Sequence, residues 1–502
     1  MIIMLMDLKI PKEIIFAIKT LKKTGFEAYL VGGCVRDLLE RKKPNDWDIA
    51  TNATPKEIQK IFKKSFYDNK FLTVKVITNS KDPTLKEIEI TTFRSEASYT
   101  DHRHPDKVKP AKTIEEDLSR RDFTVNAMAM ELNLKLDIVS GFEFRISDFN
   151  IIDPFGGQRD LENKIIRAVG DPKERFSEDA LRLLRAVRFA TTLGEGWKIE
   201  EKTKKAIKEN AHLIQKISKE RIKEELEKII MSPLAYEGFL LLHKTGLLKY
   251  IIPELEMGVG VSQNRHHIYT IFEHSLLSLK YAAKYNYNLE VRLAALLHDI
   301  AKPQTKRGEG PDATFYNHDI VGAKIARNIL YRLRFPKKVI EKVELLVKNH
   351  MFFYDPEVVT EYSVRKLLRK VGKENIKDLL CLRIADRKGS GVPKAKPYRL
   401  RHLEYMIEKV SRDPISVQML KVNGNDVMKI LNIQPGPRVG LILNALLAEV
   451  LENPKKNNKN YLLERIKEVG KMSEEELKTA GKIVEEKKME QEEELKKKYW
   501  VK

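Results

Sequence analysis

The spacing of hydrophobic positions divides the 502-residue chain into two kinds of segment. Between about residues 12 and 155, helical and strand patterns alternate. Residues 11–25 have the spacing of an amphipathic helix that ends at Gly25, and residues 27–33 have that of a buried strand. Further strands around turns are predicted at 71–80, 85–93, 126–133 and 134–140.

The second kind of segment is helical. From about residue 157 to 470 nearly every segment has helical spacing, as in 179–194. Short breaks divide this part at Pro233, Gly246 and Pro253. Residues 471–502 alternate acidic and basic clusters with few apolar anchors, which predicts a solvated helix or a frayed tail. The chain is therefore predicted to be α+β, with an α/β head on a long helical body.

Composition and charge narrow the class of protein. Hydrophobic residues make up 42% of the chain and charged residues 33%, which is ordinary for a soluble protein. The formal net charge of +21 indicates either a polyanionic partner or a lysine-rich surface that serves solubility. With only Cys34 and Cys381, no disulfide framework is expected and a reducing cytoplasm fits. No stretch reaches the roughly 18 apolar residues of a membrane span, and the apolar start 1–6 lacks a signal-peptide cleavage pattern.

Two aspartates one residue apart are the first candidates for chemistry. In NDWDIAT, a strand would point Asp46 and Asp48 to one face, and Trp47 and Ile49 to the core. Neighbouring like charges are unfavourable unless a cation lies between them, and Mg²⁺ is bound by one or two carboxylates together with substrate phosphates. The alternative is a surface strand with scattered acids.

A second acidic strand and a glycine turn favour the metal site. Glu87 and Glu89 repeat the alternation, with isoleucines facing inward. A glycine pair ends the strand 27–33 just before a helix, where backbone N–H groups attract phosphate and Gly33 allows its close approach. Arg36, on the first turn of that helix, can reach the same anion.

At these motifs the sequence resembles polymerase-β-type nucleotidyltransferases. More narrowly, it resembles class II (bacterial-type) CCA-adding enzymes, in the tRNA nucleotidyltransferase and poly(A) polymerase family. GGCVRD with NDWDIAT matches the family's metal motif, and RRDFTVNAMAM (120–130) its second motif. RFSEDALRLLRAVRF (175–189) matches the nucleotide-selecting motif, ISKERIKEELEKII (217–230) the neck helix, and residues 422–440 the C-terminal segment. The resemblance covers most of residues 12–470.

The resemblance implies addition of CCA to the 3′ end of tRNA from CTP and ATP, without a template and with release of pyrophosphate. The RNA 3′ hydroxyl would attack the α-phosphorus, and Mg²⁺ ions held by Asp46 and Asp48 would activate it and stabilise the pyrophosphate. Glu89 is the preferred third acid, which assists the 3′ hydroxyl. Further contacts to the nucleotide are implied for Arg121, Arg185 and Arg188, and the alternative for the last two is arginines that face the tRNA backbone.

Base selection has a physical reason in this motif. On one helix, Asp179 and Arg182 are three residues apart and share a face. Cytosine and adenine both present an exocyclic amine beside a ring-nitrogen acceptor, so Asp179 can accept from the amine while Arg182 donates to the ring nitrogen. Uracil and guanine would leave the carboxylate facing an oxygen. The alternative is an ordinary ion pair on an exposed helix.

The segment before the second motif bears on which nucleotides are added. A polar loop of roughly twenty residues is predicted from residue 98, and by resemblance such a loop argues against a CC-only enzyme. The departure VKPAK (108–112), where the family has a more apolar stretch, leaves an A-adding enzyme open. The sequence also leaves open a poly(A) polymerase, a phosphohydrolase whose head positions RNA, and a non-catalytic RNA-binding protein.

Histidines in the helical body indicate a second site. The adjacent pair His298 and Asp299, at the end of an apolar helix, resembles the mark of HD-domain phosphohydrolases. That resemblance implies a divalent or transition metal, with ligands at His274, His298, Asp299 and Asp386. His318 and His350 would be available for a second ion. The domain would be either a scaffold or a phosphatase or 2′,3′-cyclic phosphodiesterase on RNA ends.

Five parts are expected along the chain. They are a nucleotidyltransferase head (12–156), a helical neck with the nucleotide-selecting motif (157–240), an HD body (241–400), a tRNA-binding helical region (401–470) and a charged tail (471–502).

Overall fold

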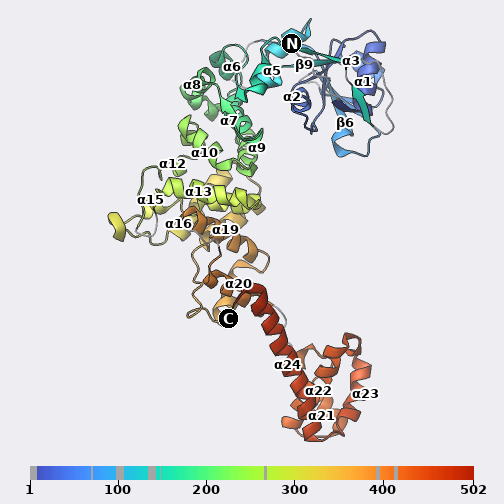
Figure 1. Ribbon diagram of the computed structural model, residues 1–502, viewed down its shortest axis with the longest axis vertical. Helices are drawn as coiled ribbons and strands as arrows, with labels where there is room; N and C mark the ends of the chain where they lie inside the picture. Colours follow the sequence, from blue (N-terminus) through green and yellow to red (C-terminus); the bar gives the residue numbers. More distant parts are fainter. Residues whose placement is uncertain are drawn as a thin grey trace. The chain divides into compact units, whose positions relative to one another are not determined.

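The computed structural model describes residues 8–68, 72–97, 107–133, 143–146, 148–264, 268–391, 396–411 and 417–501 (Figure 1). Contacts divide the chain into two compact units. The first comprises residues 1–350 with 381–392, and the second comprises 351–380 with 393–502. No helix in these ranges is both long and apolar enough to cross a bilayer.

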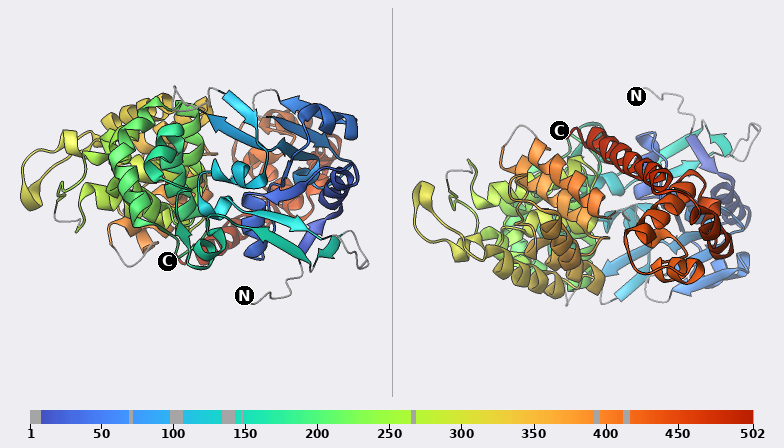
Figure 2. Two further views of the ribbon diagram at one scale, coloured as in Figure 1. Left: turned by 90° about the horizontal axis from the view of Figure 1, so that it is seen from above. Right: turned by 90° about the horizontal axis from the view of Figure 1, so that it is seen from below.

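A seven-stranded mixed sheet forms the head, in the blue and cyan part of the chain (Figure 2). In spatial order its strands are β11 (Phe149–Ile152), β9 (Ala129–Leu132), β2 (Ala28–Val31), β3 (Asp48–Thr51), β6 (Glu87–Thr92), β5 (Thr73–Ile77) and β4 (Ser65–Asp68). Strands β3 and β6 are parallel, and the other neighbours are antiparallel. Two-stranded pairs flank the sheet: β1 (Leu8–Pro11) with β10 (Glu143–Ile146), and β7 (Arg94–Ala97) with β8 (Lys107–Pro110).

The two faces of the sheet carry different cores because strand side chains alternate. On one face, Ile49 and Ile90 join a large apolar cluster with the buried side of α1 (Lys12–Lys23) and with α3 (Pro55–Ile61). On the other face, Ala50 packs with α4 (Ile114–Ser119) in a smaller cluster. Asp48 and Glu89 belong to this second face, where polar groups reach the surface near α2 (Gly33–Leu39).

Most of the predicted head elements are confirmed. The helix within 11–25 and the strands within 27–33, 71–80, 85–93 and 126–133 are present, whereas 134–140 and 1–6 lie outside the described residues. The prediction of a polar loop from residue 98 is partly wrong: 98–106 is not described, but β8 and α4 follow it. In α4 the Thr113 side chain accepts from the backbone N–H of Glu116, so the polar residues here cap a helix.

The helical body of the first unit continues from the head. Its helices are α5 (Gly157–Glu162), α6 (Pro172–Glu178), α7 (Leu181–Thr192), α8 (Glu201–Asn210), α9 (Lys219–Met231), α10 (Ala235–Lys244), α11 (Leu248–Ile251), α12 (Pro253–Glu256), α13 (Ile271–Lys284), α14 (Leu289–Leu297), α15 (Lys302–Thr305), α16 (His318–Arg332) and α17 (Lys337–Lys348). The C-terminal part of α19 (Ile376–Gly389) also belongs to this unit. Between α5 and α8 the strands β12 (Ile165–Ile166) and β13 (Lys198–Ile199) form a parallel pair that the hydrophobic pattern did not predict.

The second unit is helical. Its other helices are α18 (Glu361–Val371), α20 (Tyr398–Ser411), α21 (Gly424–Leu431), α22 (Pro437–Glu452), α23 (Lys459–Val469) and α24 (Glu474–Tyr499). The charged tail is a helix, and Leu477, Val484 and Leu495 are its buried anchors. Leu477 and Val484 join the apolar cluster of α21–α23, so this segment is more than a solvated helix.

Charged groups join α7 to the head and to α9. Arg185 forms an ion pair of 2.6 Å with the buried Asp122, which also accepts hydrogen bonds from the Asn126 side chain and the Phe123 N–H. Arg188 forms an ion pair of 2.8 Å with the buried Glu225 of α9. Burial opposes ionisation of Asp122, but Arg185 outweighs it and lowers the pKa of Asp122 to about 2.

Replacing Asp122 with Asn should therefore destabilise the protein in a pH-dependent way. Since the folded-state pKa lies below the unfolded value, the ionised carboxylate contributes about 2 kcal/mol above pH 4, and this is lost as the pH falls toward 2. Urea unfolding should show the full difference between variant and wild type at pH 7 and a shrinking difference below pH 4. The exposed Asp148→Asn is the control. A difference that stays constant down to pH 3 would contradict this assignment.

Candidate functional site

A polar cavity of about 490 Å³ opens on the second face of the head sheet, between the head and α7. Its described lining residues are Val31, Gly32, Gly33, Arg36, Asp48, Thr73, Glu89, Thr91, Arg94, Arg120, Arg121, Asp122, Asn126, Asp179, Arg182, Arg185, Phe189 and Arg221. Most of the residues predicted for nucleotide transfer thus meet in one place. Asp46 and Arg188 are not among the lining residues.

The acidic end of the cavity depends on the parallel pairing of β3 with β6. In this register Asp48 lies directly opposite Glu89. Burial raises the pKa of Asp48 to about 6; Arg121 opposes the rise, and the charges of Glu89 and Asp46 add to it. Asp48 therefore lies close to two further acidic residues, and carboxylate oxygens are the ligands that a hard divalent cation such as Mg²⁺ prefers.

The prediction that Asp46 lies on the strand is wrong. The strand begins at Asp48, and Asp46 lies exposed in the bend before it. Trp47 and Ile49 are both buried, as predicted. The alternation of buried and more exposed side chains therefore extends to Trp47, although the hydrogen-bonded strand begins only at Asp48. In the described part of the head, no strand pairs with residues 45–47, which leaves the Asp46 backbone outside the sheet.

The glycine turn lies beside Arg121. Gly32 has φ +78°, and a Cβ atom there would be 2.6 Å from the Arg121 guanidinium, so this position requires glycine for backbone and for space. Asp117, buried in α4, pairs with Arg121 at 3.3 Å and helps to fix its position. Arg36 donates to the Asn126 side chain at 2.7 Å. The structure therefore brings Gly33, Arg36 and Arg121 together with Asp48.

The base-selecting pair has a different geometry from the predicted one. The helix is interrupted at Asp179, which has φ −132° and ψ 104° between α6 and α7. Its carboxylate accepts from the Leu181 N–H at 3.0 Å, and this bond favours the break over a continuous helix. Asp179 and Arg182 thus do not share a face of one helix, but both line the cavity.

Each of these two side chains has a partner within the chain. Arg221 of α9 donates to both oxygens of Asp179, at 3.3 and 2.8 Å. Arg182 donates to Glu178 at 2.6 Å and to the backbone carbonyl oxygens of Arg175 and Arg120. Both groups are therefore held in place by contacts within the chain.

Arg185 and Arg188 lie on successive turns of α7. Arg185 faces the cavity and Asp122, whereas Arg188 stacks on the Phe189 ring at 3.5 Å from its centroid and pairs with Glu225. Arg188 is thereby engaged with the neck, away from the cavity lining.

Several lining residues were not predicted. Asp122 and Asn126 lie within the quoted second motif, and Arg221 lies within the quoted neck helix. For Asp122 and Asn126 the available signal was their polar character beside apolar residues, whereas Arg221 lies among other charged residues and carried no such signal. Arg94 and Phe189 carried no such signal, because each belongs to an ordinary strand or helix pattern.

A second cluster of donors lies at the centre of the helical body. His274 comes from α13, His298 and Asp299 follow α14, His318 begins α16, and His350 follows α17. Asp386 comes from α19, which approaches α13 so closely that a Cβ on Gly389 would be 2.3 Å from the Ser278 hydroxyl. All six predicted ligands are buried.

The donor atoms of this cluster converge. The Nε2 atoms of His274 and His298 are 3.0 Å apart, and each is 3.3 Å from Asp299 Oδ2. Asp386 Oδ1 is 3.3 Å from His274, and the Nε2 atoms of His318 and His350 are 3.3 Å apart. Two groups of three ligand atoms, which share Asp299, each lie within 4.8 Å of one another.

The orientation of the imidazole rings fits metal ligands. The Nδ1 atoms of His298, His318 and His350 face the backbone carbonyl oxygens of Ala295, Phe315 and Val347 at 3.0, 2.6 and 2.6 Å. Because a carbonyl oxygen only accepts, these Nδ1 atoms carry the hydrogen and the Nε2 lone pairs face one another. A cation between them removes that repulsion, and such second hydrogen bonds are typical of histidine ligands.

Charge at two members of the cluster is consistent with the same interpretation, whereas at His274 the Asp299 and Asp386 carboxylates outweigh burial and raise the pKa to about 9, so this ring must release a proton when a metal binds. Burial opposes ionisation of Asp299, yet His298 and Lys302 hold its pKa well below the usual range. Burial, together with His298, lowers the pKa of His350 to about 3. A deprotonated carboxylate and a neutral imidazole are the forms that bind metals.

Three family models match the chain. The Poly A polymerase head domain matches residues 28–167, the "Probable RNA and SrmB- binding site of polymerase A" matches 196–258, and the HD domain matches 271–388. These matches confirm the predicted α+β fold, with its polymerase-β-type head and HD domain.

Individual proteins are similar over most of the chain or over nearly half of it. A CCA-adding enzyme of Geobacillus sp. (strain WCH70) is 34% identical over 454 residues, which is 89% of this chain and 94% of the relative. A CCA-adding enzyme of Lactobacillus helveticus (strain DPC 4571) is 45% identical over 231 residues, 46% of this chain and 52% of the relative.

Solved structures have the same fold. The crystal structure of the Bacillus stearothermophilus CCA-adding enzyme in complex with CTP has a TM-score of 0.55 and 29% identity, and the match covers 91% of this chain and 96% of that one. The Thermotoga maritima CCA-adding enzyme complexed with tRNA shares the fold with a TM-score of 0.53 at 20% identity, over 92% of this chain and 99% of that one. The extent of these similarities, together with the motifs that meet in the cavity, shows that the chain belongs to the family of CCA-adding enzymes, which are nucleotidyltransferases.

Proposed function

We propose that this chain adds CCA to the 3′ end of tRNA from CTP and ATP, without a nucleic-acid template and with release of pyrophosphate. The observation that carries the proposal is that one cavity is lined both by the acids Asp48 and Glu89 and by Asp179 and Arg182. Chemistry and base selection thus have one site. The names of the relatives, including an enzyme solved with CTP and one solved with tRNA, support the same substrates.

In this proposal the acids at one end of the cavity bind the metal, and the arginines bind the triphosphate. Asp46 and Asp48 would hold Mg²⁺, and Glu89 accepts the proton of the RNA 3′ hydroxyl. When bound, the metal would activate that hydroxyl and neutralise charge on the departing pyrophosphate. Gly33 leaves room for the triphosphate beside the glycine turn, and Arg36, Arg121 and Arg185 offer it positive charge. Arg188, which lies outside the cavity lining, instead supports Phe189 and the neck.

Base selection follows from hydrogen-bond polarity. Asp179 accepts from the exocyclic amine of cytosine or adenine, and Arg182 donates to the adjacent ring nitrogen. Uracil or guanine would place an oxygen against the carboxylate and leave a charge unpaired. Arg221 orients the Asp179 carboxylate by binding both its oxygens, which still leaves a lone pair of Oδ2 for the base. Arg221 is thus a positioning residue in this proposal.

The five expected parts of the chain stay a prediction, with the head, neck and HD body serving transfer, selection and tRNA contact. The basic surplus would bind the acceptor-arm phosphates, with affinity that falls as salt rises. An A-adding enzyme and a poly(A) polymerase are the competing activities, since both use the same head motifs.

The decisive experiment supplies tRNA ending before CCA with CTP alone, ATP alone or both. CCA should form only with both nucleotides, and Asp48→Asn should reduce the rate by about a thousandfold or more because a metal-binding carboxylate is lost. Product length on sequencing gels is the measurement. Asp148→Asn, which alters an exposed acid outside the cavity lining, is the control. Addition of A to a CC end alone, or long A tracts, would favour a competing activity.

Arg221→Met should relax base selection. With the Asp179 carboxylate no longer bound by Arg221 and retaining only the described bond from the Leu181 N–H, incorporation of U or G relative to C should rise by about tenfold, while CTP turnover changes less. Single-turnover rates with each nucleotide provide the measurement. Lys223→Met on the same helix is the matched control. An equal slowing for all four nucleotides would mean that Arg221 only supports the fold.

A second function is proposed for the HD cluster: metal-dependent hydrolysis of phosphate or 2′,3′-cyclic phosphate at RNA ends. The observation that favours it is the convergence of the Nε2 lone pairs and carboxylates around one point. His274, His298, Asp299 and Asp386 would hold the first ion, with His318 and His350 beside it for a second. When bound, the metal supplies an activated water for attack on phosphorus.

His298→Ala should abolish both metal binding and phosphohydrolase activity while leaving CCA addition intact. Metal content of the purified protein, measured by mass spectrometry after dialysis against Mn²⁺, Ni²⁺ or Zn²⁺, checks the site independently of activity. His243→Ala, a histidine that pairs with Glu256 outside the cluster, should retain the metal. Equal metal content in the two variants would exclude this site, and metal without hydrolysis would leave a scaffold role.

A further inference from the structure

A groove of about 840 Å³ lies on the first face of the head sheet, opposite the cavity. Neighbouring residues of a strand point to opposite faces, and on β6 Ile88 lines the groove while Glu89 lines the cavity. The groove lies between α1, the end of α3 with the turn after it, and the strands β5 and β6. An occupant here would leave the cavity open.

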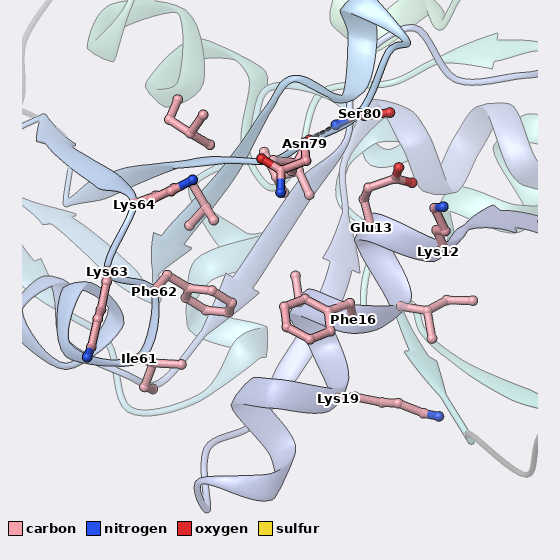
Figure 3. A pocket seen from close by; sticks show the side chains of 16 residues that line it. Lys12, Glu13, Phe16, Lys19, Ile61, Phe62, Lys63, Lys64, Asn79 and Ser80 are labelled. Atoms are coloured by element: carbon pink, nitrogen blue, oxygen red, sulfur yellow. Dashed lines mark hydrogen bonds between the residues drawn. The ribbon is translucent and has the colours of Figure 1, made fainter. Parts of the chain in front are cut away.

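The centre of the groove is apolar. Phe16 projects from the outer side of α1 with 65% of its surface exposed, although α1 buries its other large apolar residues. Figure 3 shows the Phe16 ring near that of Phe62, in the middle of the lining. Ile61, Val76 and Ile88 also line the groove, although Val76 and Ile88 are buried and belong to the main apolar cluster. A single exposed phenyl ring is ordinary on a protein surface; here the ring lies beside a groove whose other central lining residues are also apolar, and together they form a candidate interaction site.

The rim of the groove is basic. Four lysines surround the phenyl rings in Figure 3, and Glu13 is the acid among the described lining residues; the lysines are Lys12, Lys19, Lys63 and Lys64. Lys19, Lys63 and Lys64 form no ion pair with any described residue. By contrast, Lys75 on the cavity side pairs with Glu89 at 3.3 Å. The groove therefore presents unneutralised positive charge around an apolar centre.

We propose that this groove docks an acidic amphipathic segment of a partner protein. Apolar side chains on one face of such a segment would cover Phe16 and Phe62, while flanking Asp and Glu residues would neutralise the lysines. The inference rests on the groove alone and is independent of the proposed catalytic function. It assigns the head two separate faces, one for nucleotide chemistry and one for a protein.

The lining favours a peptide over single-stranded RNA. RNA grooves combine several exposed aromatic rings with arginines, whereas Phe62 is only 7% exposed and none of the described lining residues is an arginine. The arginines of the head gather instead in the cavity, where Arg36, Arg94 and Arg121 lie. One exposed ring could stack a single base, while the apolar volume suits several aliphatic side chains.

The test uses a fluorescein-labelled helical peptide of about 15 residues, with leucines at i, i+3, i+4 and i+7 and with Asp and Glu at the flanking positions. Fluorescence anisotropy with the full-length protein should show saturable binding that weakens as salt rises. A peptide with lysines in place of the acids, and one with serines in place of the leucines, should each bind at least about tenfold more weakly.

Variants locate the binding. Phe16→Ser and the triple change Lys19→Glu, Lys63→Glu and Lys64→Glu should each weaken peptide binding by about tenfold, with CCA addition unchanged. The matched controls are Phe66→Ser, whose ring is 69% exposed outside the groove, and the exposed triple Lys56→Glu, Lys81→Glu and Lys86→Glu. Equal effects of groove and control variants, no preference for the acidic peptide, or displacement by oligo(U) through Phe16 would each overturn the proposal.

Discussion

The parallel pairing of β3 with β6 is the constraint on which the rest of the head depends. It places Asp48 opposite Glu89 in a ladder whose other face is buried in the main apolar cluster. A slip of one residue would turn Ile49 and Ile90 into solvent, so burial of the isoleucines holds the acids in place. The repulsion that adds to the raised pKa of Asp48 is thus maintained by hydrophobic packing behind it.

A second constraint joins the head to the neck. A chain of polar contacts runs from Arg36 through Asn126 and Asp122 to Arg185, and then to Glu225 and Arg188. Buried ion pairs add little net stability because desolvation offsets the attraction, but an unmatched partner is strongly unfavourable. Such a network therefore specifies one arrangement of α7 and α9 against the head. That arrangement puts the Asp179 break and Arg221 at the same cavity as Asp48.

In the HD cluster, helix ends orient the metal-binding side chains. His298, His318 and His350 each lie at or beside a helix terminus, where the backbone carbonyl oxygen three residues earlier accepts a hydrogen bond from Nδ1. Each ring is thereby turned with Nε2 inward by purely local geometry. Tight packing at Gly389 then brings Asp386 to His274 from a segment more than a hundred residues away. Local contacts therefore orient the individual rings, whereas tertiary packing brings the ligands together.

The sequence by itself determined the alternation of the head, the helical body and the identity of most polar groups that line the two sites. Asp48 and Glu89 were identifiable because acids alternate with buried apolar residues along their segments, whereas Arg121 and the HD histidines were identified through the resemblance to known families. Only the tertiary structure decided that Asp46 lies outside the ladder, that the helix breaks at Asp179, and that Arg221 binds its carboxylate. Periodicity predicts which face of a helix or strand a residue occupies. It does not predict where a side chain accepts a backbone N–H and interrupts a helix, as Asp179 does, or which distant helix supplies the opposite charge, as α9 does with Arg221.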